Sequence, residues 1–316
     1  MIAAVSLLGY AAAMATVGPW LLNRTRWTLR SPRLGILAWF ALVSSVLVAV
    51  LMASVVAWLP RWPGTRGLAD LLNTCAMLLQ QQYRTPAGAV TGTVGLLLAL
   101  AVVARLLLCG MRIGVTTRRA RRAQRHLISM VGPVSGPHPG YHVVHHQEPA
   151  AYCIPGRHPE IVLTSATLSS LDGPQLRAVL AHEREHLRGH HHLLVALAEA
   201  ARDAFPFVPA FVAAFEEITR LVEMRADQRA VEATDELTLA SALLRLAQGR
   251  TPIGSLAAGG SALVARVGRL TEPMQPLTLA HGVAVHVAAL MLAVVPVLIA
   301  AAPALAVVSA PYCPVW

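Results

Sequence analysis

The sequence predicts a mainly α-helical membrane protein, with four transmembrane helices and one α+β domain between the third and the fourth. Three observations predict this fold class: a low content of charge, four long apolar stretches, and one more polar segment that mixes strand-like and helix-like patterns. Of the 316 residues, 55% are apolar and only 13% are charged, whereas a soluble domain carries about 25% charged residues. This composition excludes an ordinary soluble protein.

Each apolar stretch is long enough to cross a bilayer, which takes about 20 residues in a helix. The first three spans are predicted within a membrane region 1–111, and the fourth within a C-terminal region 282–316. The first span has no charged residue and lacks the basic start of a signal peptide, so we interpret it as retained. The third contains Arg105, close enough to its end to reach the surface. The spans cover residues 2–22, 34–59, 88–111 and 283–308.

The placement of arginine predicts the orientation. All 26 basic residues are arginines, against 16 acidic residues. One group lies between the first two spans, and another follows the third span at positions 112–125. By the positive-inside rule both groups lie in the cytoplasm, so residues 112–281 are cytoplasmic and both chain ends are extracellular. Because these arginines adjoin apolar runs, we expect them to contact the lipid bilayer and not nucleic acid.

Residues 112–281 form the predicted α+β domain. Short β-branched runs bounded by Pro and Gly are typical of strands, and they occur at 141–146 and 160–164. Asp172 followed by Gly-Pro predicts the start of a helix, which runs through Gly189 to about residue 203. The segment "FPFVPAF" ends it, and further helices are expected over 210–232 and 235–247.

The first of these helices contains the motif "HEREH" at positions 182–186. Positions i and i+4 share one helix face, so His182 and His186 can bind the same zinc ion. Glu183 points beside the metal, where it can act as the general base of a hydrolase. The motif therefore predicts a metal-dependent peptidase.

A catalytic zinc site takes three protein ligands. We expect the third to be Glu223, in the sequence "EMRAD" of a later helix. Asp227, one turn further along, can accept a hydrogen bond from a ligand imidazole. Neighbouring acidic residues such as Glu216 and Glu217 lack the Ala-Asp that follows in this motif.

Three consecutive histidines follow the motif at positions 190–192, and at most one of them can face the metal side of a helix. His190, four residues after His186, is the best placed to contact the transition state. The alternative is that these residues form an exposed helix end.

The segments "LTSATLSSLDGPQLRAVLAHEREHLRGHHH" and "LVEMRADQRAV" resemble the gluzincin-type integral membrane metallopeptidases. Two relatives share this motif pair, the HtpX-type quality-control proteases and the BlaR/MecR-type sensor-transducers. Three spans before the domain and one after it match the BlaR/MecR plan, whereas a pair of spans follows the motif in the HtpX type. The chain ends within ten residues of its last span, so it is expected to lack the penicillin-binding sensor domain of the BlaR/MecR type.

The resemblance implies a multi-pass protein of the bacterial cell membrane, whose cytoplasmic domain is a gluzincin-type zinc endopeptidase with one Zn²⁺ per chain. The substrate would be a protein or peptide, with a winged-helix repressor as one candidate in signal transduction. Two alternative functions stay open, HtpX-like quality control and a non-enzymatic receptor scaffold. Whether the chain forms a homodimer stays open as well. In the family an edge strand before the zinc helix binds substrate. That would make Ile161, Val162 and Leu163 substrate contacts; an ordinary strand is the alternative.

Two further features leave alternatives open. Four of the five phenylalanines lie between Phe205 and Phe215, where they either pack in a core or dip into the inner leaflet of the membrane. Cys75 and Cys313 both lie in predicted extracellular regions, where they either form a disulfide or are two unpaired thiols.

Overall fold

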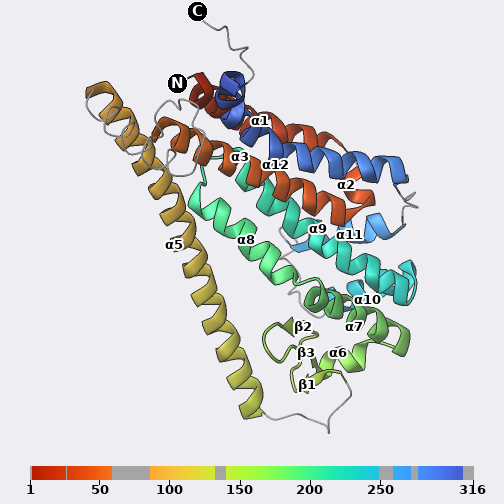
Figure 1. Cartoon of the computed structure of the whole chain (residues 1–316). Coiled ribbons are helices and arrows are strands. Elements are labelled where there is room, and N and C mark those ends of the chain that lie inside the picture. The colour runs from red at the N-terminus through yellow and green to blue at the C-terminus, as the bar shows by residue number, and fades with distance from the viewer. Residues whose placement is uncertain are drawn as a thin grey trace, which may run out of the picture.

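The computed structural model describes residues 2–25, 27–58, 86–131, 140–248, 259–271 and 277–308 (Figure 1). The N-terminal part contains α1 (Ile2–Arg24), α2 (Trp27–Arg30) and α3 (Pro32–Trp58), and α5 (Pro86–Val131) follows. The remaining elements are β1 (His142–Val144), β2 (Ala151–Ile154), β3 (Glu160–Thr164), α6 (Ser165–Ser170), α7 (Gly173–Arg188), α8 (His191–Ala204), α9 (Pro209–Ala233), α10 (Glu236–Gln248), α11 (Gly259–Thr271) and α12 (Leu279–Val308). Cys75 and Cys313 lie outside the described residues.

Four of the described helices are long and apolar enough to cross a membrane, namely α1, α3, α5 and α12. They confirm the four predicted spans, and the protein is a multi-pass membrane protein. The start of α1 and the end of α12 lie together, and the sheet with α6 and α7 lies away from them (Figure 1).

The helix α5 is continuous over 46 residues. The predicted boundary between membrane region and domain, at residues 111 and 112, lies inside this helix. Near its far end, Nη2 of Arg125 donates a hydrogen bond to the carbonyl oxygen of His158 at 2.8 Å. Gly156 leaves room for this contact, because a Cβ there would come within 2.6 Å of Nη2 of Arg125. Thus α5 connects the membrane region to the turn between β2 and β3 without a break.

The described strands form one sheet in the order β1-β3-β2, with β1 parallel and β2 antiparallel to β3. The expectation that residues 160–164 form an edge strand is therefore wrong. Ile161, Val162 and Leu163 are buried in a strand that is paired on both sides, and they are not available to a substrate peptide. The cause is β2, the four-residue strand "AYCI" between two prolines, which was not expected and occupies the outer position.

The long helix expected over 174–203 is also divided. Its start is as predicted, since Asp172 and Gln175 form a reciprocal capping box. It ends at Arg188, and α8 begins at His191 after a residue, His190, in the left-handed region with φ of 50°. Everything after Gly189 is therefore rotated relative to the face that carries the "HEREH" motif.

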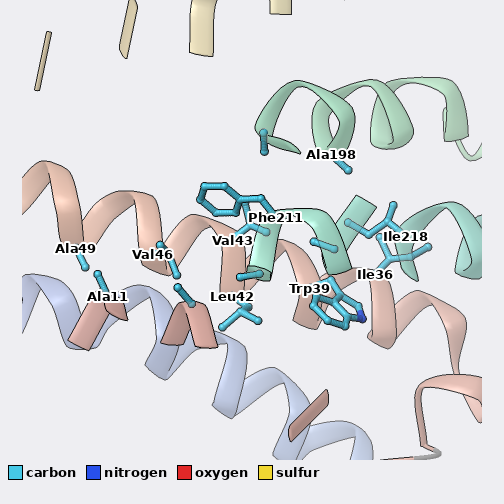
Figure 2. Packing of buried hydrophobic residues seen from close by; sticks show 14 of the residues in the cluster. Ala11, Ile36, Trp39, Leu42, Val43, Val46, Ala49, Ala198, Phe211 and Ile218 are labelled. Atoms are coloured by element: carbon cyan, nitrogen blue, oxygen red, sulfur yellow. The ribbon is translucent and has the colours of Figure 1, made fainter. Parts of the chain in front are cut away.

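The largest apolar core joins the spans to the domain. It contains buried side chains from α1, α3, α8 and α9, several of which Figure 2 shows. A smaller core lies between β3, α7 and α10, around Leu163, Val179 and Ala242. The division at residue 111 therefore does not separate two cores, because α9 packs directly on α1 and α3.

Candidate metal centre

The structure brings together the three predicted metal ligands. His182 and His186 lie one turn apart on α7, and their Nε2 atoms are 3.1 Å from each other. Glu223 comes from α9, with its carboxylate oxygens 3.6 Å from Nε2 of His182 and 3.4 Å from Nε2 of His186. These three residues are the group in the described part of the chain whose ligand atoms could hold a metal ion. We call them the His–His–Glu group.

The spacing of the His–His–Glu group fits zinc. A tetrahedral zinc ion with bonds of about 2.0–2.1 Å to its ligands separates the ligand atoms by about 3.4 Å. The three observed separations, 3.1, 3.4 and 3.6 Å, lie around that value. Two neutral imidazoles and one carboxylate are also the donor set of many catalytic zinc sites.

The electrostatics of the group favour a cation. Burial would lower the pKa of His182, but hydrogen bonds with Asp227 and Glu223 outweigh it and raise the pKa to about 9. Burial would raise the pKa of Glu223, but the hydrogen bond with His182 and nearby positive charges lower it to about 2. Because a metal ion takes the place of a proton on its ligands, carboxylates that favour protonated His182 also favour a divalent cation there.

Asp227 lies where the sequence predicted, behind the first histidine. Its Oδ1 is 3.1 Å from Nδ1 of His182, and its side chain is fully buried. Hydrogen bonds with His182 and Arg266 hold its pKa well below the usual range, although burial acts in the opposite direction. A carboxylate in this position fixes the orientation of the ring and leaves Nε2 free for the metal.

Two arginines of α11 were not expected in the site. Arg266 places Nε 2.9 Å and Nη2 2.5 Å from the two oxygens of Asp227, and its Nη1 is 3.4 Å from Glu223. Arg269 adds a weaker contact, 3.6 Å from Asp227. Their spacing of three residues, which puts both on one helix face, is the signal that sequence reasoning could have used.

The histidine run contacts the site through His191 and not through His190. Nδ1 of His191 is 3.0 Å from Nδ1 of His186, and His191 is buried. The exposed His190 instead pairs its Nδ1 with the carbonyl oxygen of Arg188 at 3.0 Å. The prediction that His190 shares the metal-facing side of one continuous helix is wrong, because the helix is interrupted at this residue.

Glu183 follows the first ligand on α7 and is half-buried. Burial raises the pKa of its carboxyl group above the usual range, which suits a group that must accept a proton near neutral pH. The thiol of Cys153 on β2 is hydrogen-bonded to it, and burial together with this neighbouring charge raises the pKa of Cys153 to about 12. Strand β2, the outer strand of the described sheet, therefore passes directly beside the predicted base.

This fold and site define a membrane metallopeptidase of the H-E-x-x-H type, with a His–His–Glu donor set built between two helices. The family model of peptidase family M48 matches residues 117–286, more than half of the chain. The chain therefore belongs to peptidase family M48, whose members are zinc-dependent peptidases. Comparison with curated proteins and with solved structures gave no match.

Proposed function

We propose that the protein is a zinc-dependent endopeptidase that hydrolyses peptide bonds of protein substrates at the cytoplasmic face of the membrane. The observation that carries this proposal is the convergence of the His–His–Glu group beside Glu183. The arginines at positions 112–125 support the orientation, since they lie on α5 towards the sheet, on the side of the candidate site.

In the proposed mechanism His182, His186 and Glu223 hold one zinc ion. When bound, zinc supplies Lewis-acid polarisation of the scissile carbonyl and lowers the pKa of water. Glu183 accepts a proton from the attacking water at its carboxylate and then donates it to the leaving amine. Asp227 and His191 orient the two ligand rings from behind, and Arg266 holds Asp227 in place.

The substrate peptide is proposed to bind along β2. Within the described residues β2 has a strand neighbour only on its β3 side, and the backbone of an edge strand can pair with an extended peptide. Cys153 of β2 contacts Glu183, so a peptide added there would pass over the catalytic base. This moves the predicted role in substrate binding from residues 161–163 to residues 151–154.

Cleavage of a transcriptional repressor in signal transduction is the proposed role of this activity, with quality control of membrane proteins as the alternative. The two share all of the site chemistry and differ in substrate. Cells that carry Glu183→Gln would accumulate one intact repressor in the first case and many damaged membrane proteins in the second. Comparing the proteins that persist in variant and wild-type cells distinguishes the two roles.

The direct test uses the full-length protein in liposomes, with bound zinc and hydrolysis of labelled casein measured together. Glu183→Gln should retain zinc and lose hydrolysis, because the base is not a ligand. Glu236→Gln makes the same chemical change at an exposed carboxylate of α10 and should retain both. His186→Ala should lose zinc. Wild-type hydrolysis by Glu183→Gln, or undiminished zinc in His186→Ala, would contradict the proposal.

A further inference from the structure

The hairpin of α8 and α9 packs on membrane spans along much of its length. Buried apolar residues of α9 share one core with α1 and α3 (Figure 2). Phe211 of α9 lies beside Val43 of α3, and Ile218 lies beside Ile36 in the same view. Helix α8, which begins at His191, and helix α9, which supplies Glu223, are therefore part of the bundle that the membrane spans form.

The contacts with α3 measure how deep the hairpin reaches. Leu221 lies against Gly35, where an added Cβ would come within 2.9 Å of its Cδ1. Because Phe211 contacts the region of Val43, the two helices are antiparallel. From Gly35 to Val43 the helix rises about 12 Å, and the hydrocarbon layer is about 30 Å thick. Since the apolar part of α3 begins at Leu34, Phe211 lies well inside the depth of that layer.

A contact with α5 gives a second, independent measure of how deep the hairpin reaches. Arg105 donates a hydrogen bond from Nε to the carbonyl oxygen of Ala204, the last residue of α8. Arg105 precedes Met111, the predicted end of the span, by six residues, or about 9 Å of helix. Two different spans thus place the end of α8 and the start of α9 at similar depths. Arg105 is bound to backbone and does not need to reach the surface.

The turn between the helices is suited to a medium without water. Pro206 and Pro209 have no N–H group to satisfy. Phe205 donates to Ala201, and Val208 donates to Phe205, each at 3.0 Å. In hydrocarbon, each unpaired backbone group would cost several kcal/mol, so a turn with few free donors is expected there.

The charged side chains near the turn neutralise one another. Arg202 lies 2.7 Å from Asp203 and 3.5 Å from Glu199, and its guanidinium carbon is 3.9 Å above the ring of Phe215. Arg105 is held in a similar way, by the carbonyl oxygen of Ala204. Charged residues at membrane depth pair with each other or with backbone carbonyls in this way.

We propose that the α8–α9 hairpin enters the bilayer from the side of the His–His–Glu group, and that its tip, residues 205–209, contacts lipid acyl chains. Phe207 at the tip is 75% exposed and is the side chain that meets lipid. Glu223 lies two residues beyond Leu221 on α9, so the His–His–Glu group lies at the surface of the bilayer. The insertion does not depend on the proposed function.

The test measures the depth of three exposed positions along the hairpin, Leu193, Leu197 and Phe207. Each is changed to cysteine in full-length protein whose four native cysteines are replaced by alanine, labelled with an environment-sensitive fluorophore, and reconstituted in liposomes. Quenching is compared between lipids that carry a nitroxide in mid-chain and iodide in the water. Leu97→Cys on span α5 serves as the lipid control, and Glu236→Cys on α10 as the water control.

The proposal predicts that the loss of fluorescence with mid-chain nitroxide increases from 193 through 197 to 207, where it equals the loss at position 97. Iodide should quench position 236 and leave position 207 unaffected. Iodide quenching at position 207 as strong as at 236 would overturn the proposal, because the tip would then lie in water or in a water-filled cavity. Equal nitroxide quenching at all three positions would overturn it as well.

Discussion

The two histidines of the "HEREH" motif are held from behind in two different ways. Nδ1 of His182 faces Asp227, a buried carboxylate that is itself bound by Arg266. Nδ1 of His186 faces another imidazole, that of His191, and burial lowers the pKa of both rings to about 4. One ligand is therefore fixed by a charged network and the other by a neutral pair.

This difference determines which ring nitrogen carries the proton in each pair. A histidine that binds metal through Nε2 carries its proton on Nδ1. His186 must then donate this proton to Nδ1 of His191, whose own proton lies on Nε2. The neutral pair fixes a tautomer by a single hydrogen bond, whereas the charged network also supplies negative charge. We expect the two sides to differ in how strongly they affect metal binding and stability.

The largest expected effect is on the charged side. Asp227→Ala removes the partner of His182 and leaves Arg266 and Arg269 without their buried counter-charge. Zinc affinity should fall by about 10–100-fold, and breaking a buried ion pair should lower the free energy of unfolding by about 3–5 kcal/mol. Chelator competition and thermal unfolding measure the two effects. Asp227→Asn, which keeps the shape and an acceptor, should lose less of both; unchanged affinity in Asp227→Ala would remove this residue from the site.

A smaller effect is expected on the neutral side. His191→Ala should weaken zinc binding by about tenfold, the lower end of what such a loss costs, with little change in stability because no charge is left unpaired. His191→Asp converts the neutral pair into a second carboxylate–imidazole pair and should restore the affinity. If His191→Asp binds zinc as weakly as His191→Ala, the ring of His191 does not act through Nδ1 of His186.

Gly189→Ala tests the same pair without changing either ring. An added Cβ would lie 2.5 Å from Nε2 of His191, so the ring must move. A side chain displaced from its preferred rotamer costs about 0.5–1.5 kcal/mol, which corresponds to a loss of zinc affinity of about two- to tenfold. The effect should vanish when Gly189→Ala is combined with His191→Ala; an additive loss in the double variant would show that Gly189 acts by another route.

The smallest expected effect is at His190. Its ring contacts the backbone of Arg188 and is exposed, so His190→Ala should leave zinc affinity and casein hydrolysis unchanged. Chelator competition and initial rates, measured beside His191→Ala, check this. A loss at position 190 equal to that at 191 would contradict the placement of the two rings.

Local spacing accounts for what the sequence predicted correctly. The i, i+4 relation brought His182 to His186, and apolar runs located all four spans. Local spacing could not place His191 in the site, because that required knowing that the helix breaks at His190, a non-glycine residue in the left-handed region. Arg266 was not predicted for a different reason: its spacing from Arg269 places both arginines on one helix face, but nothing in the sequence shows that this face meets Asp227, which lies 39 residues away.

The sheet and the core show a further limit of sequence reasoning. The strand "AYCI" is only four residues long, too short for its alternation to be detected, so nothing in the sequence corrected the edge position that the family resemblance implied for residues 160–164. Likewise, the sequence left open whether the phenylalanines between Phe205 and Phe215 pack in a core or dip into the membrane. Periodicity shows that a helix face is apolar but does not tell whether protein or membrane spans cover it.

The continuity of α5 gives it the geometry of a lever arm. From Met111, near the predicted end of the span, to Arg125, at the β2–β3 turn, the helix rises about 21 Å. A tilt of about 10° at the membrane end would move the far end by about 4 Å, close to the spacing of about 4.8 Å between neighbouring strands. A small change in the inclination of this span, such as a change in bilayer thickness produces, would therefore displace the hairpin that borders Glu183 by about the width of a strand.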